Sequence, residues 1–467
     1  MSDAYLNFAN SPFGANLTAW LGLPRPVPLE RWSTGQPVIE GEVLVAAGDE
    51  PEFVPDLVQA FKSMQARTLA HASVPGWTAR ANQAGLMSGP WNVGDLSGGP
   101  LKAVVFDASG LRTIDQAEAL HACFHQAARA IQACGRVVVI GRPSEECADV
   151  QQAAVQRGLE GFVRALAKEL KRGITAQTVL VAQGAEAQLE GTLRFLLSAR
   201  SAYVSAQVIR LAVSAQPSDT DWAQPLGGRR IMVTGAARGI GAAIAQALAR
   251  DGAQVWCVDV PQAQEALQAV ADGLQGQALA LDITTEEAIP TLIETAKRAG
   301  GWDGVVHNAG ITRDKTISRM RSEHWRTLMQ VNLMAPERIT QALWEAGALR
   351  EQARVVCVSS ISGIAGNVGQ TNYAFSKAGV IGLVQGMAPR MAQQGMAINA
   401  VAPGFIETQM TAAIPWAVRE AGRRMNSMGQ GGQPVDVAEA IAWLLSPAAV
   451  GVNGQVLRVC GQSWIGA

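Results

Sequence analysis

Tyr373, Lys377 and Ser360 have side chains whose types and spacing suit proton transfer. Tyr373 and Lys377 are four residues apart, so on a helix their side chains share one face. Ser360 lies thirteen residues before the tyrosine, directly after a short apolar run. A phenol with a pKa of about 10 exchanges protons poorly near neutral pH, and a neighbouring ammonium lowers that pKa. The three residues therefore predict an acid, a cation that activates it and a hydroxyl that stabilises a developing alkoxide.

A glycine-rich run predicts a second kind of site, one for a dinucleotide. The run Thr234–Gly241 joins an apolar strand, Arg230–Val233, to a helix that begins at Ala242. Such glycines permit a tight turn, close approach of the backbone to a pyrophosphate, and tight packing of helix on strand. The helix N-terminus adds N–H donors and a positive dipole end. The glycines are Gly235, Gly239 and Gly241, with Arg238 and Ile240 between them.

Charged residues near this run bear on which dinucleotide is bound. Asp259 follows the next expected strand, Gln254–Val258, and lies eighteen residues after the run. A carboxylate there accepts hydrogen bonds from ribose hydroxyls and repels a 2′-phosphate, which favours NAD(H). Arg238 favours a 2′-phosphate instead, because its positive charge could stabilise one. We give Asp259 more weight because it would contact the ribose directly. Asp282, followed by Ile283, is either an adenine contact or part of a helix N-cap.

The elements that would position these residues alternate between strand and helix along almost the whole chain. Short apolar runs indicate buried parallel strands, and longer amphipathic stretches indicate the helices between them. The expected strands are Val43–Ala46, Ala103–Phe106, Val137–Ile140, Arg230–Val233, Gln254–Val258, Gly304–His307 and Val355–Val358, and two of the expected helices are Ile114–Ala133 and Ala242–Asp251. This alternation predicts an α/β fold of doubly wound parallel sheets, Rossmann-like or flavodoxin-like.

Three collinear matches within the chain predict two related domains. The matched pairs are Phe195–Leu211 with Trp443–Val459, Gly158–Ala167 with the stretch around Gly382, and Arg136–Ile140 with Arg354–Val358. Between the halves, Ala215–Gly228 is polar, rich in Pro and Gly and without periodicity, as a domain boundary would be. We therefore predict a degenerate N-terminal domain, residues 1–225, and a catalytic domain, residues 226–467.

The N-terminal domain is expected to bind no cofactor. Its first strand leads into A-G-D-E-P-E, in which Asp49, Glu50 and Glu52 would repel a pyrophosphate. Gln152 and Gln156 stand at the positions that match the tyrosine and the lysine of the other half. A structural or regulatory role is the interpretation that these replacements favour.

Composition excludes several other classes of protein. Of 467 residues, 48% are hydrophobic and 16% are charged, which is too apolar for a disordered chain. A formal net charge of −1 lacks the basic excess of a general nucleic-acid binder, and we see neither a membrane span nor a secretory signal. Six cysteines without a C-x-x-C pair indicate free thiols in a cytoplasmic protein. His121 and His125 share a helix face without a third ligand, so we expect no metal site.

Taken together, these motifs resemble the short-chain dehydrogenase/reductase family over roughly residues 228–467. The resemblance rests on Thr234–Gly241, Asn308–Gly310, Asn332, Ser360, Tyr373, Lys377 and Pro403-Gly404. Three stretches are similar to FabG-type 3-oxoacyl-[acyl-carrier-protein] reductases: Asn308–Asp314 with Arg319-Met320, Gly366–Tyr373, and Asn399–Thr411. The extra N-terminal domain and the tail R-V-C-G-Q-S resemble the high-molecular-weight FabG subgroup, whose members are described as preferring NADH.

The resemblance implies reduction of 3-oxoacyl thioesters by a hydride from NADH. Tyr373 would protonate the carbonyl oxygen, Lys377 would lower the tyrosine pKa and hold the nicotinamide ribose, and Ser360 would stabilise the alkoxide. Asn332 would hold a water that relays protons to the lysine. The implied coenzyme contacts are Gly235, Arg238, Gly239, Ile240, Gly241, Asp259, Asp282, Ile283, Asn308, Ala309, Gly310, Tyr373, Lys377, Pro403, Gly404, Ile406 and Thr408.

Substrate delivery and assembly are also implied by the resemblance. Phe405–Pro434 would be a hinged lid over the acyl chain, because it is too long for a plain connector. The thioester would arrive on acyl carrier protein or on coenzyme A. Basic residues that could form the rim where an acidic carrier docks are Arg313, Arg319, Arg321, Arg423 and Arg424. We expect a homodimer through the helix Tyr373–Gln394 and the helix that contains Asn332.

Two alternatives stay open. One is another short-chain dehydrogenase that runs toward oxidation, such as a 3-hydroxyacyl-CoA dehydrogenase. The other is a nucleotide-sensing scaffold without turnover, although sensing would not require the full set of catalytic side chains.

Overall fold

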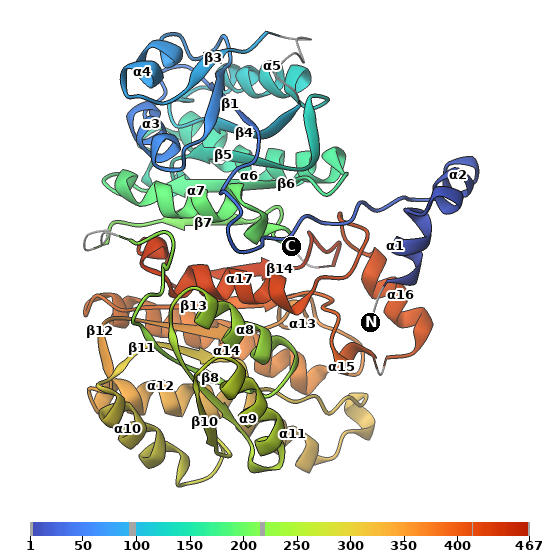
Figure 1. The fold of residues 1–467 in the computed structure, drawn as a ribbon, viewed down its shortest axis with the longest axis vertical. Helices are drawn as coiled ribbons and strands as arrows, with labels where there is room; N and C mark the ends of the chain where they lie inside the picture. The colour runs from blue at the N-terminus through green and yellow to red at the C-terminus, as the bar shows by residue number, and fades with distance from the viewer. Residues whose placement is uncertain (1–2, 93–99, 215–219, 413, 466–467) are drawn as a thin grey trace. The chain divides into compact units, whose positions relative to one another are not determined.

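The computed structural model describes residues 3–92, 100–214, 220–412 and 414–465. These residues form two compact units, each built around one parallel sheet (Figure 1). The C-terminal unit comprises Ala215–Met425 and Gly431–Ala467, and the N-terminal unit comprises Ser2–Ser214 together with Asn426–Gln430. The first part of the expected boundary segment, residues 215–219, lies outside the described residues.

The C-terminal unit contains a seven-stranded sheet in the order β10-β9-β8-β11-β12-β13-β14. All of its recorded strand pairs are parallel. The strands are β8 (Arg230–Thr234), β9 (Gln254–Asp259), β10 (Gln277–Ala280), β11 (Trp302–His307), β12 (Leu349–Val358), β13 (Ala397–Pro403) and β14 (Val456–Val459). The strand order reverses between β8 and β11, which is where open α/β sheets bind ligands, at the carboxyl ends of the strands.

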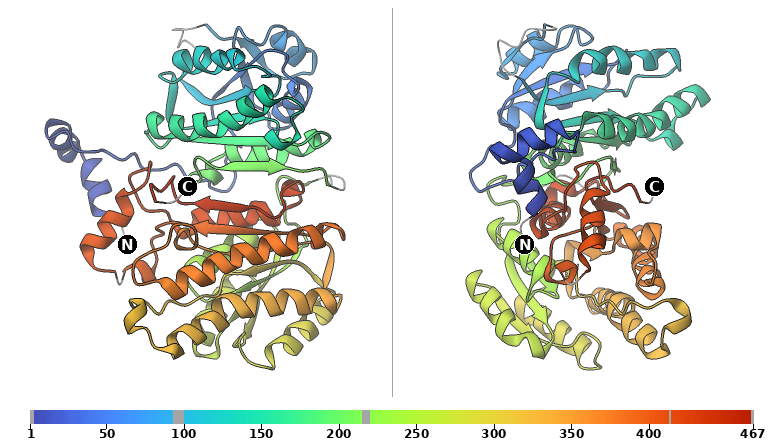
Figure 2. Two further views of the ribbon diagram at one scale, coloured as in Figure 1. Left: turned by 180° about the vertical axis from the view of Figure 1, so that it is seen from behind. Right: turned by 90° about the vertical axis from the view of Figure 1, so that its right-hand side faces the viewer.

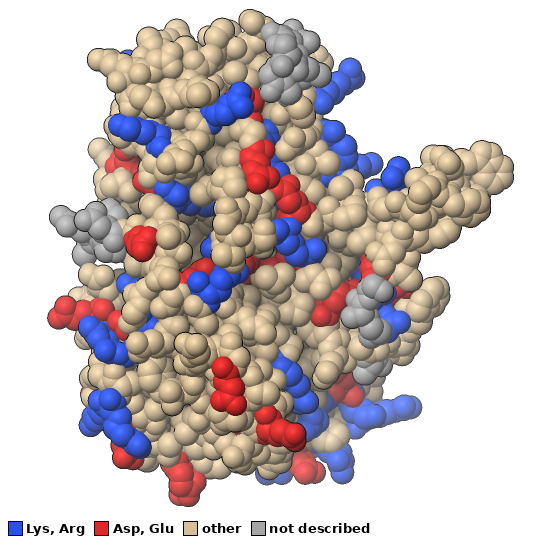
Figure 3. All heavy atoms as spheres, viewed as in Figure 1, with Lys and Arg blue, Asp and Glu red and all other residues tan. Residues whose placement is uncertain are grey.

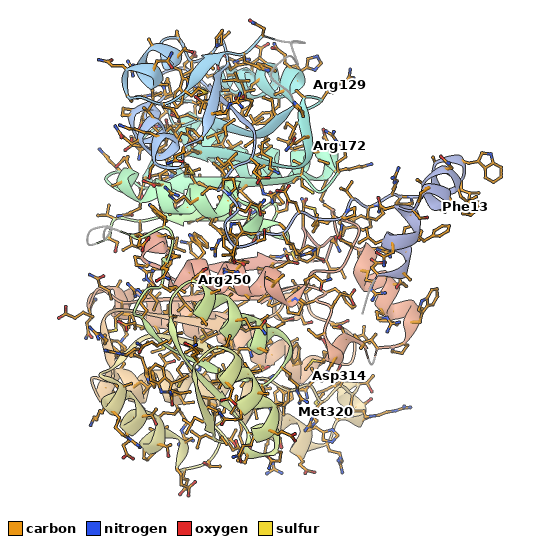
Figure 4. All side chains as sticks on the ribbon, in the orientation of Figure 1. Phe13, Arg129, Arg172, Arg250, Asp314 and Met320 are labelled. Atoms are coloured by element: carbon orange, nitrogen blue, oxygen red, sulfur yellow. The ribbon has the colours of Figure 1, made fainter. Side chains whose placement is uncertain are left out.

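Helices cover both faces of this sheet. On one face α8 (Gly239–Arg250) packs against α17 (Pro434–Leu445), and Arg250, labelled in Figure 4, donates to both carboxylate oxygens of Glu439 (2.5 and 3.0 Å). A separate hydrophobic core joins the sheet to α10 (Ala288–Ala299), α12 (Ala335–Glu345) and α14 (Thr371–Ala392). Figure 2 shows the ribbon of this unit from two further sides. The other helices are α9 (Gln264–Gly273), α11 (Ser322–Met329), α13 (Ile361–Ala365), α15 (Gln409–Ala412) and α16 (Trp416–Arg424).

The N-terminal unit contains a second parallel sheet, in the order β3-β2-β1-β4-β5-β6-β7. Its strands are β1 (Glu42–Ala47), β2 (Arg67–Ala70), β3 (Ser88–Pro90), β4 (Leu101–Asp107), β5 (Ile131–Gly141), β6 (Thr175–Val181) and β7 (Val208–Leu211). Its helices are α1 (Ala4–Ala9), α2 (Pro12–Trp20), α3 (Val54–Ser63), α4 (Trp77–Gln83), α5 (Glu118–Ala127), α6 (Val150–Leu170) and α7 (Leu189–Leu197). Within this unit the Tyr203 hydroxyl donates to the carbonyl of Gln430 (2.8 Å), whose side chain donates to the carbonyl of Val27 (2.7 Å).

The expected α/β architecture is confirmed, and each expected strand lies in or overlaps an observed one. The apolar runs that predicted β1 and β4 are buried along their whole length, as central parallel strands should be. One helix prediction, Ile114–Ala133, is wrong at its C-terminal end, because α5 stops at Ala127 and β5 begins at Ile131. Ile131 pairs with Leu101 of β4, a contact distant in sequence that local periodicity cannot reveal.

The internal matches fall on equivalent elements of the two sheets. β7 and β14 form the ends of one matched pair, β5 and β12 contain another, and α6 and α14 contain the third. Even the buried arginines correspond: Arg136 of β5 donates to the carbonyl of Ser198 (3.1 Å), and Arg354 of β12 donates to that of Ala449 (3.0 Å). In each unit the arginine fixes the segment that leads into the last strand.

Acidic and basic side chains are interspersed over the visible face (Figure 3). Within the described ranges, no helix combines the length and the apolar character that crossing a bilayer requires.

Candidate active site

The glycine-rich run forms a tight turn between β8 and α8. Gly235 and Gly239 have φ angles of +68° and +58°, a region that residues with a Cβ rarely adopt. A Cβ on Gly235 would lie 2.9 Å from the Cα of Ala309, and one on Gly241 would lie 1.9 Å from the carbonyl oxygen of Gly235. The turn therefore leaves room only for glycine, and it fits a pyrophosphate at the N-terminus of α8.

Asn308 supports this turn from the end of β11. Its Nδ2 donates to the carbonyl oxygens of Thr234 (3.0 Å) and Gly235 (3.1 Å). The Thr234 hydroxyl in turn accepts from the N–H groups of Asn308 and Ala309, both at 3.1 Å. Asn308 thus lies at the predicted site, where its side chain holds the glycine turn in shape.

Asp259 lies beside the same turn. Its Oδ2 accepts from the N–H of Ala237 (2.9 Å) and its Oδ1 from the N–H of Val260 (2.8 Å). Arg238, the next residue of the turn, is exposed to solvent. A negative and a positive group therefore lie at the turn where the sequence predicts the adenosine ribose.

Asp282 occupies a local turn after β10. Its Oδ1 accepts from both the N–H (2.9 Å) and the hydroxyl (2.7 Å) of Thr284. The N-cap of α10 is Glu287, so the alternative interpretation of Asp282 as part of that helix cap is wrong. Asp282 and Ile283 are half-buried one strand beyond Asp259.

The side chains of Tyr373 and Ser360 are close enough for Ser360 to affect the pKa of the tyrosine. Tyr373 is in the first turn of α14, and Ser360 is the N-cap of α13, where its Oγ accepts from the N–H of Ser362 (3.1 Å). Burial raises the pKa of Tyr373 above its usual value, the hydrogen bond with Ser360 opposes that rise, and the charge of Asp314 (labelled in Figure 4) adds to it. Burial is the largest of these effects, so in the chain alone the pKa of Tyr373 is raised and not lowered as the sequence predicted.

Lys377 is held one turn further along α14. Its Nζ donates to the carbonyl of Val358 at the end of β12 (2.7 Å) and lies 5.7 Å from the centre of the Tyr373 ring. Burial lowers the pKa of Lys377 to about 8. A Cβ on Gly310 would lie 3.5 Å from both this Nζ and the Oδ1 of Asn332, so the three residues meet at one point.

Asn332 lies in a π-helical turn, Gln330–Met334, between α11 and α12. Its Oδ1 accepts from the N–H of Ile311 (2.9 Å), while its Nδ2 donates to the carbonyl of Ile311 (3.0 Å) and to Ser376 (3.3 Å). Turns of this kind interrupt the regular helical hydrogen bonding and often occur at functional sites. The amide of Asn332 thus makes three hydrogen bonds within the protein.

Two residues that the sequence analysis gave no role fix the loop in front of the tyrosine. The buried Asn372 donates to the carbonyl of Arg313 (3.2 Å) and accepts from the N–H of Tyr373 (2.8 Å). Gln370 donates to a carboxylate oxygen of Asp314 (2.8 Å). Both lie in the stretch Gly366–Tyr373, but their hydrogen-bond partners could not be predicted from the sequence.

The segment after β13 returns to the glycine turn. Gly404 follows Pro403 and donates its N–H to β14 (2.9 Å). Ile406 is buried, and the Cγ2 of Thr408 lies 4.0 Å from where a Cβ of Gly239 would be. The predicted coenzyme contacts from the two ends of the domain thus meet beside the glycine turn.

Two of the five arginines proposed for a carrier-docking rim do not lie on it. Arg423 is only 5% exposed and donates to Glu407 and Glu420, and the half-buried Arg424 donates to Glu420 (3.2 Å). The prediction was wrong for both because their charges are paired inside the segment. The exposed basic residues of the neighbouring loop are Arg313, Lys315, Arg319 and Arg321.

Side chains of the N-terminal unit fill the place that corresponds to this site. Arg142, which follows β5, donates to Glu52 (2.7 and 2.9 Å) and to Glu186 (2.8 Å). Gln156, fully buried, accepts from the N–H of Arg142 (2.9 Å), and Gln152 lies in the first turn of α6. Ion pairs and an amide thus stand where the other unit has its hydroxyl and its amine.

An internal carboxylate lies at the start of the first helix after β1 in that unit. The buried Asp107 accepts from the N–H of Phe53 at the start of α3 (2.9 Å) and from the backbone and side chain of Ser109. α3 follows the first strand just as α8 follows β8. A carboxylate at that end satisfies the helix dipole that a pyrophosphate would otherwise stabilise.

The cysteines are free thiols, as expected, and all six of them lie in the described chain. His121 and His125 of α5 stack with ring centroids 5.2 Å apart. Within the described residues, no three or more His, Cys, Asp or Glu side chains gather as a metal site would require.

Comparisons with known proteins place similarity in the C-terminal half. A family model described as enoyl-(acyl carrier protein) reductase matches residues 235–461. The 3-oxoacyl-[acyl-carrier-protein] reductase FabG of Vibrio cholerae is 41% identical over 239 residues, 50% of this chain and 97% of the relative. The proteins of the same name from Escherichia coli and Thermotoga maritima are 38% and 39% identical over 237 and 240 residues; each match again spans 50% of this chain, and 96% and 98% of the relatives.

Proposed function

Because this chain belongs to the short-chain dehydrogenase/reductase family as a FabG-type reductase, we propose that it reduces 3-oxoacyl thioesters to 3-hydroxyacyl thioesters. The observation that carries the proposal is the meeting of Ser360, Tyr373 and Lys377 at the strand ends beside the glycine turn. The test is steady-state turnover of acetoacetyl-CoA and of longer 3-oxoacyl thioesters with NADH or NADPH. If neither NADH nor NADPH were oxidised with any of these thioesters, the proposal would be contradicted.

The chain's residues fit a nicotinamide coenzyme. The glycine turn leads into the N-terminus of α8. A Cβ at Gly235 or Gly241 would collide with neighbouring atoms, and the helix N-terminus suits the pyrophosphate. Asp259 would bind the adenosine ribose and Lys377 the nicotinamide ribose. The bound coenzyme supplies the hydride that reduces the 3-keto carbon.

Tyr373 is the proton donor in this proposal. Its raised pKa keeps the phenol protonated at neutral pH, so it can give its proton to the carbonyl oxygen as that oxygen gains charge. Ser360, already hydrogen-bonded to Tyr373, would donate to the same oxygen. The amine of Lys377 stabilises the phenolate that remains, and the π-helical turn at Asn332 supplies backbone groups for a water that returns the proton.

The activity should fall at alkaline pH, and the pKa of Lys377 sets the pH at which the fall begins. The charged form of Lys377 exists below its pKa of about 8 and disappears as the pH rises through that value. Tyr373 stays protonated over this range because its pKa is raised. We expect kcat/KM for reduction to be flat below about pH 8 and to fall about tenfold per pH unit above it. A profile measured with saturating coenzyme that stays flat to about pH 10 would contradict this assignment.

The coenzyme is proposed to be NADH rather than NADPH. The carboxylate of Asp259 would repel a 2′-phosphate, while the exposed Arg238 can turn toward solvent. We expect kcat/KM to be at least about tenfold higher with NADH, and Asp259→Asn to remove most of that difference. Asparagine keeps an oxygen for the N–H of Ala237, so the glycine turn keeps that hydrogen bond, while the bond from the N–H of Val260 is lost together with the charge. The exposed Asp272→Asn is the matched control, and a wild-type ratio at or below one would refute the preference.

The thioester carrier is proposed to be acyl carrier protein. Arg313, Lys315, Arg319 and Arg321 are exposed on the loop between β11 and α11, close in sequence to the Asn308–Gly310 strand end. An acidic carrier would bind these cations, and salt would weaken that binding. The carrier-bound substrate should therefore have a lower KM than the coenzyme A thioester, and only the former KM should rise strongly with ionic strength.

The N-terminal half is proposed to be a domain of residues 1–225 that binds no coenzyme and completes the assembly. Gly382 and Gly386 of α14 face open space, as do Gly158 and Gly161 of the equivalent helix α6. Small residues let a second helix approach closely, so α14 would pair with its copy in a homodimer and α6 would pair in the same way. One dimer would then imitate an assembly of four catalytic units.

Solution mass tests this assembly. The full chain should be a dimer, and residues 226–467 alone should be tetrameric or unstable. A full-length tetramer would count against this arrangement of two catalytic and two N-terminal units. A truncated dimer with undiminished stability and activity would also count against it.

A further inference from the structure

Arg423 is a buried arginine on α16 that the proposed chemistry does not use. Its Nε donates to the Oε1 of Glu407 (2.5 Å) and its Nη2 to the Oε2 of the same carboxylate (2.9 Å). Its Nη1 donates to Glu420. The side chains of Arg423 and Glu407 are only 5% and 6% exposed, so this two-point contact is shielded from water. The hydrogen bonds that Arg423 donates to Glu407 raise the pKa of Arg423, which keeps the guanidinium charged.

Glu407 lies in the segment that contacts the coenzyme in the proposed function. It stands between Ile406 and Thr408, and its N–H donates to the carbonyl of Gly432 (2.8 Å). A Cβ on Gly431 would lie 2.6 Å from the Oε1 of Glu407, so this carboxylate fits only against a glycine. The position of Glu407 is thereby fixed from two sides, by Arg423 and by the Gly431–Gly432 backbone.

α16 itself is a short amphipathic helix with exposed apolar side chains. Trp416 and Val418 are 70% and 61% exposed. Its Gly422 packs on Phe405, since a Cβ there would lie 2.6 Å from the Phe405 ring. Exposed apolar side chains next to a coenzyme-contacting segment suit contact with the acyl chain of a thioester.

We propose that Arg423 is a positioning residue that fixes the lid helix α16 to the segment Ile406–Thr408, so that binding of the coenzyme and binding of the acyl thioester reinforce each other. Movement of either segment would separate a buried guanidinium from its carboxylate, which is costly, so the two move as one piece. The proposal rests on the proposed function, because it takes the coenzyme and the acyl chain as the two ligands.

The test measures this reinforcement directly. The Kd of NADH is determined by titration of the full-length protein, alone and with a saturating 3-hydroxyacyl thioester, and the ratio of the two values is the coupling factor. Coupling is reciprocal at equilibrium, so the same factor must appear for the thioester. We expect a factor of at least about fivefold in the wild type.

Arg423→Lys should reduce that factor to near one. Lysine keeps a positive charge in the pair, which favours folding, but it lacks the planar fork that grips both carboxylate oxygens. The double variant Arg423→Gln with Glu407→Gln leaves no unpaired charge between the two and should lose coupling as well. Arg424→Gln, on the neighbouring arginine of the same helix, should keep the wild-type factor.

The outcomes separate this proposal from the one that it rests on. Full coupling in folded Arg423→Lys or in the double variant, or a wild-type factor of one, would overturn the role of Arg423. Lack of thioester turnover in the wild type would instead overturn the proposed function. A merely structural arginine would lower the melting temperature of its variants while leaving the coupling factor unchanged.

Discussion

Replacement of Tyr373 by phenylalanine should lower kcat for thioester reduction by at least about 100-fold and leave the Kd of NADH nearly unchanged. The aromatic ring, which fills its place in the first turn of α14, remains. Only the hydroxyl is lost, and with it the proton donor and the hydrogen bond to Ser360. Steady-state kinetics give kcat, and titration with NADH gives the Kd.

Tyr5→Phe is the matched control for that variant. The Tyr5 hydroxyl also makes a hydrogen bond, to the carbonyl of Pro24 (2.5 Å), but Tyr5 lies on α1 in the N-terminal unit. This control should keep wild-type kinetics. Retention of more than about one percent of the wild-type kcat in Tyr373→Phe would show that another group donates the proton.

Lys377→Ala should damage both the rate and the binding of the coenzyme. The amine lies 5.7 Å from the centre of the Tyr373 ring, and we assign it both the activation of the tyrosine and the nicotinamide ribose. We expect kcat to fall by at least about 100-fold and the Kd of NADH to rise at least about tenfold. Steady-state kinetics and titration with NADH again give kcat and the Kd.

Lys102→Ala controls for the loss of a buried lysine. Lys102 and Lys377 are equally buried, each 4% exposed, but Lys102 pairs with Glu30 in the N-terminal unit (2.5 Å). Its variant should lose stability without the combined loss of rate and coenzyme affinity. An unchanged Kd of NADH in Lys377→Ala would remove the lysine from the coenzyme site.

The elements that carry strong local patterns could be predicted from the sequence. The glycine turn follows from steric limits that only glycine meets, and the buried strands follow from continuous apolar runs. The Tyr373–Lys377 spacing requires only helical periodicity. The end of α5 could not be predicted, because β5 begins where Ile131 pairs with a strand thirty residues earlier in the chain.

Burial and partner choice account for most of what the sequence did not reveal. Arg423 and Arg424 looked like surface cations, and only the fold shows that Glu407 and Glu420 pair with them. The pKa of Tyr373 depends on how much water the fold excludes, which no spacing of residues encodes. Such contacts join residues that are distant in sequence or are decided by packing.

Transfer of deuterium from the coenzyme tests the central claim most directly. With a 3-oxoacyl thioester and NADH that carries deuterium at the transferred position of the nicotinamide, the product should be a 3-hydroxyacyl thioester with deuterium on C3. Tyr373→Phe should yield almost none of it. Recovery of the 3-oxoacyl thioester without label, while a 2-enoyl thioester is reduced to a saturated, labelled chain, would contradict the account and identify a different reduction.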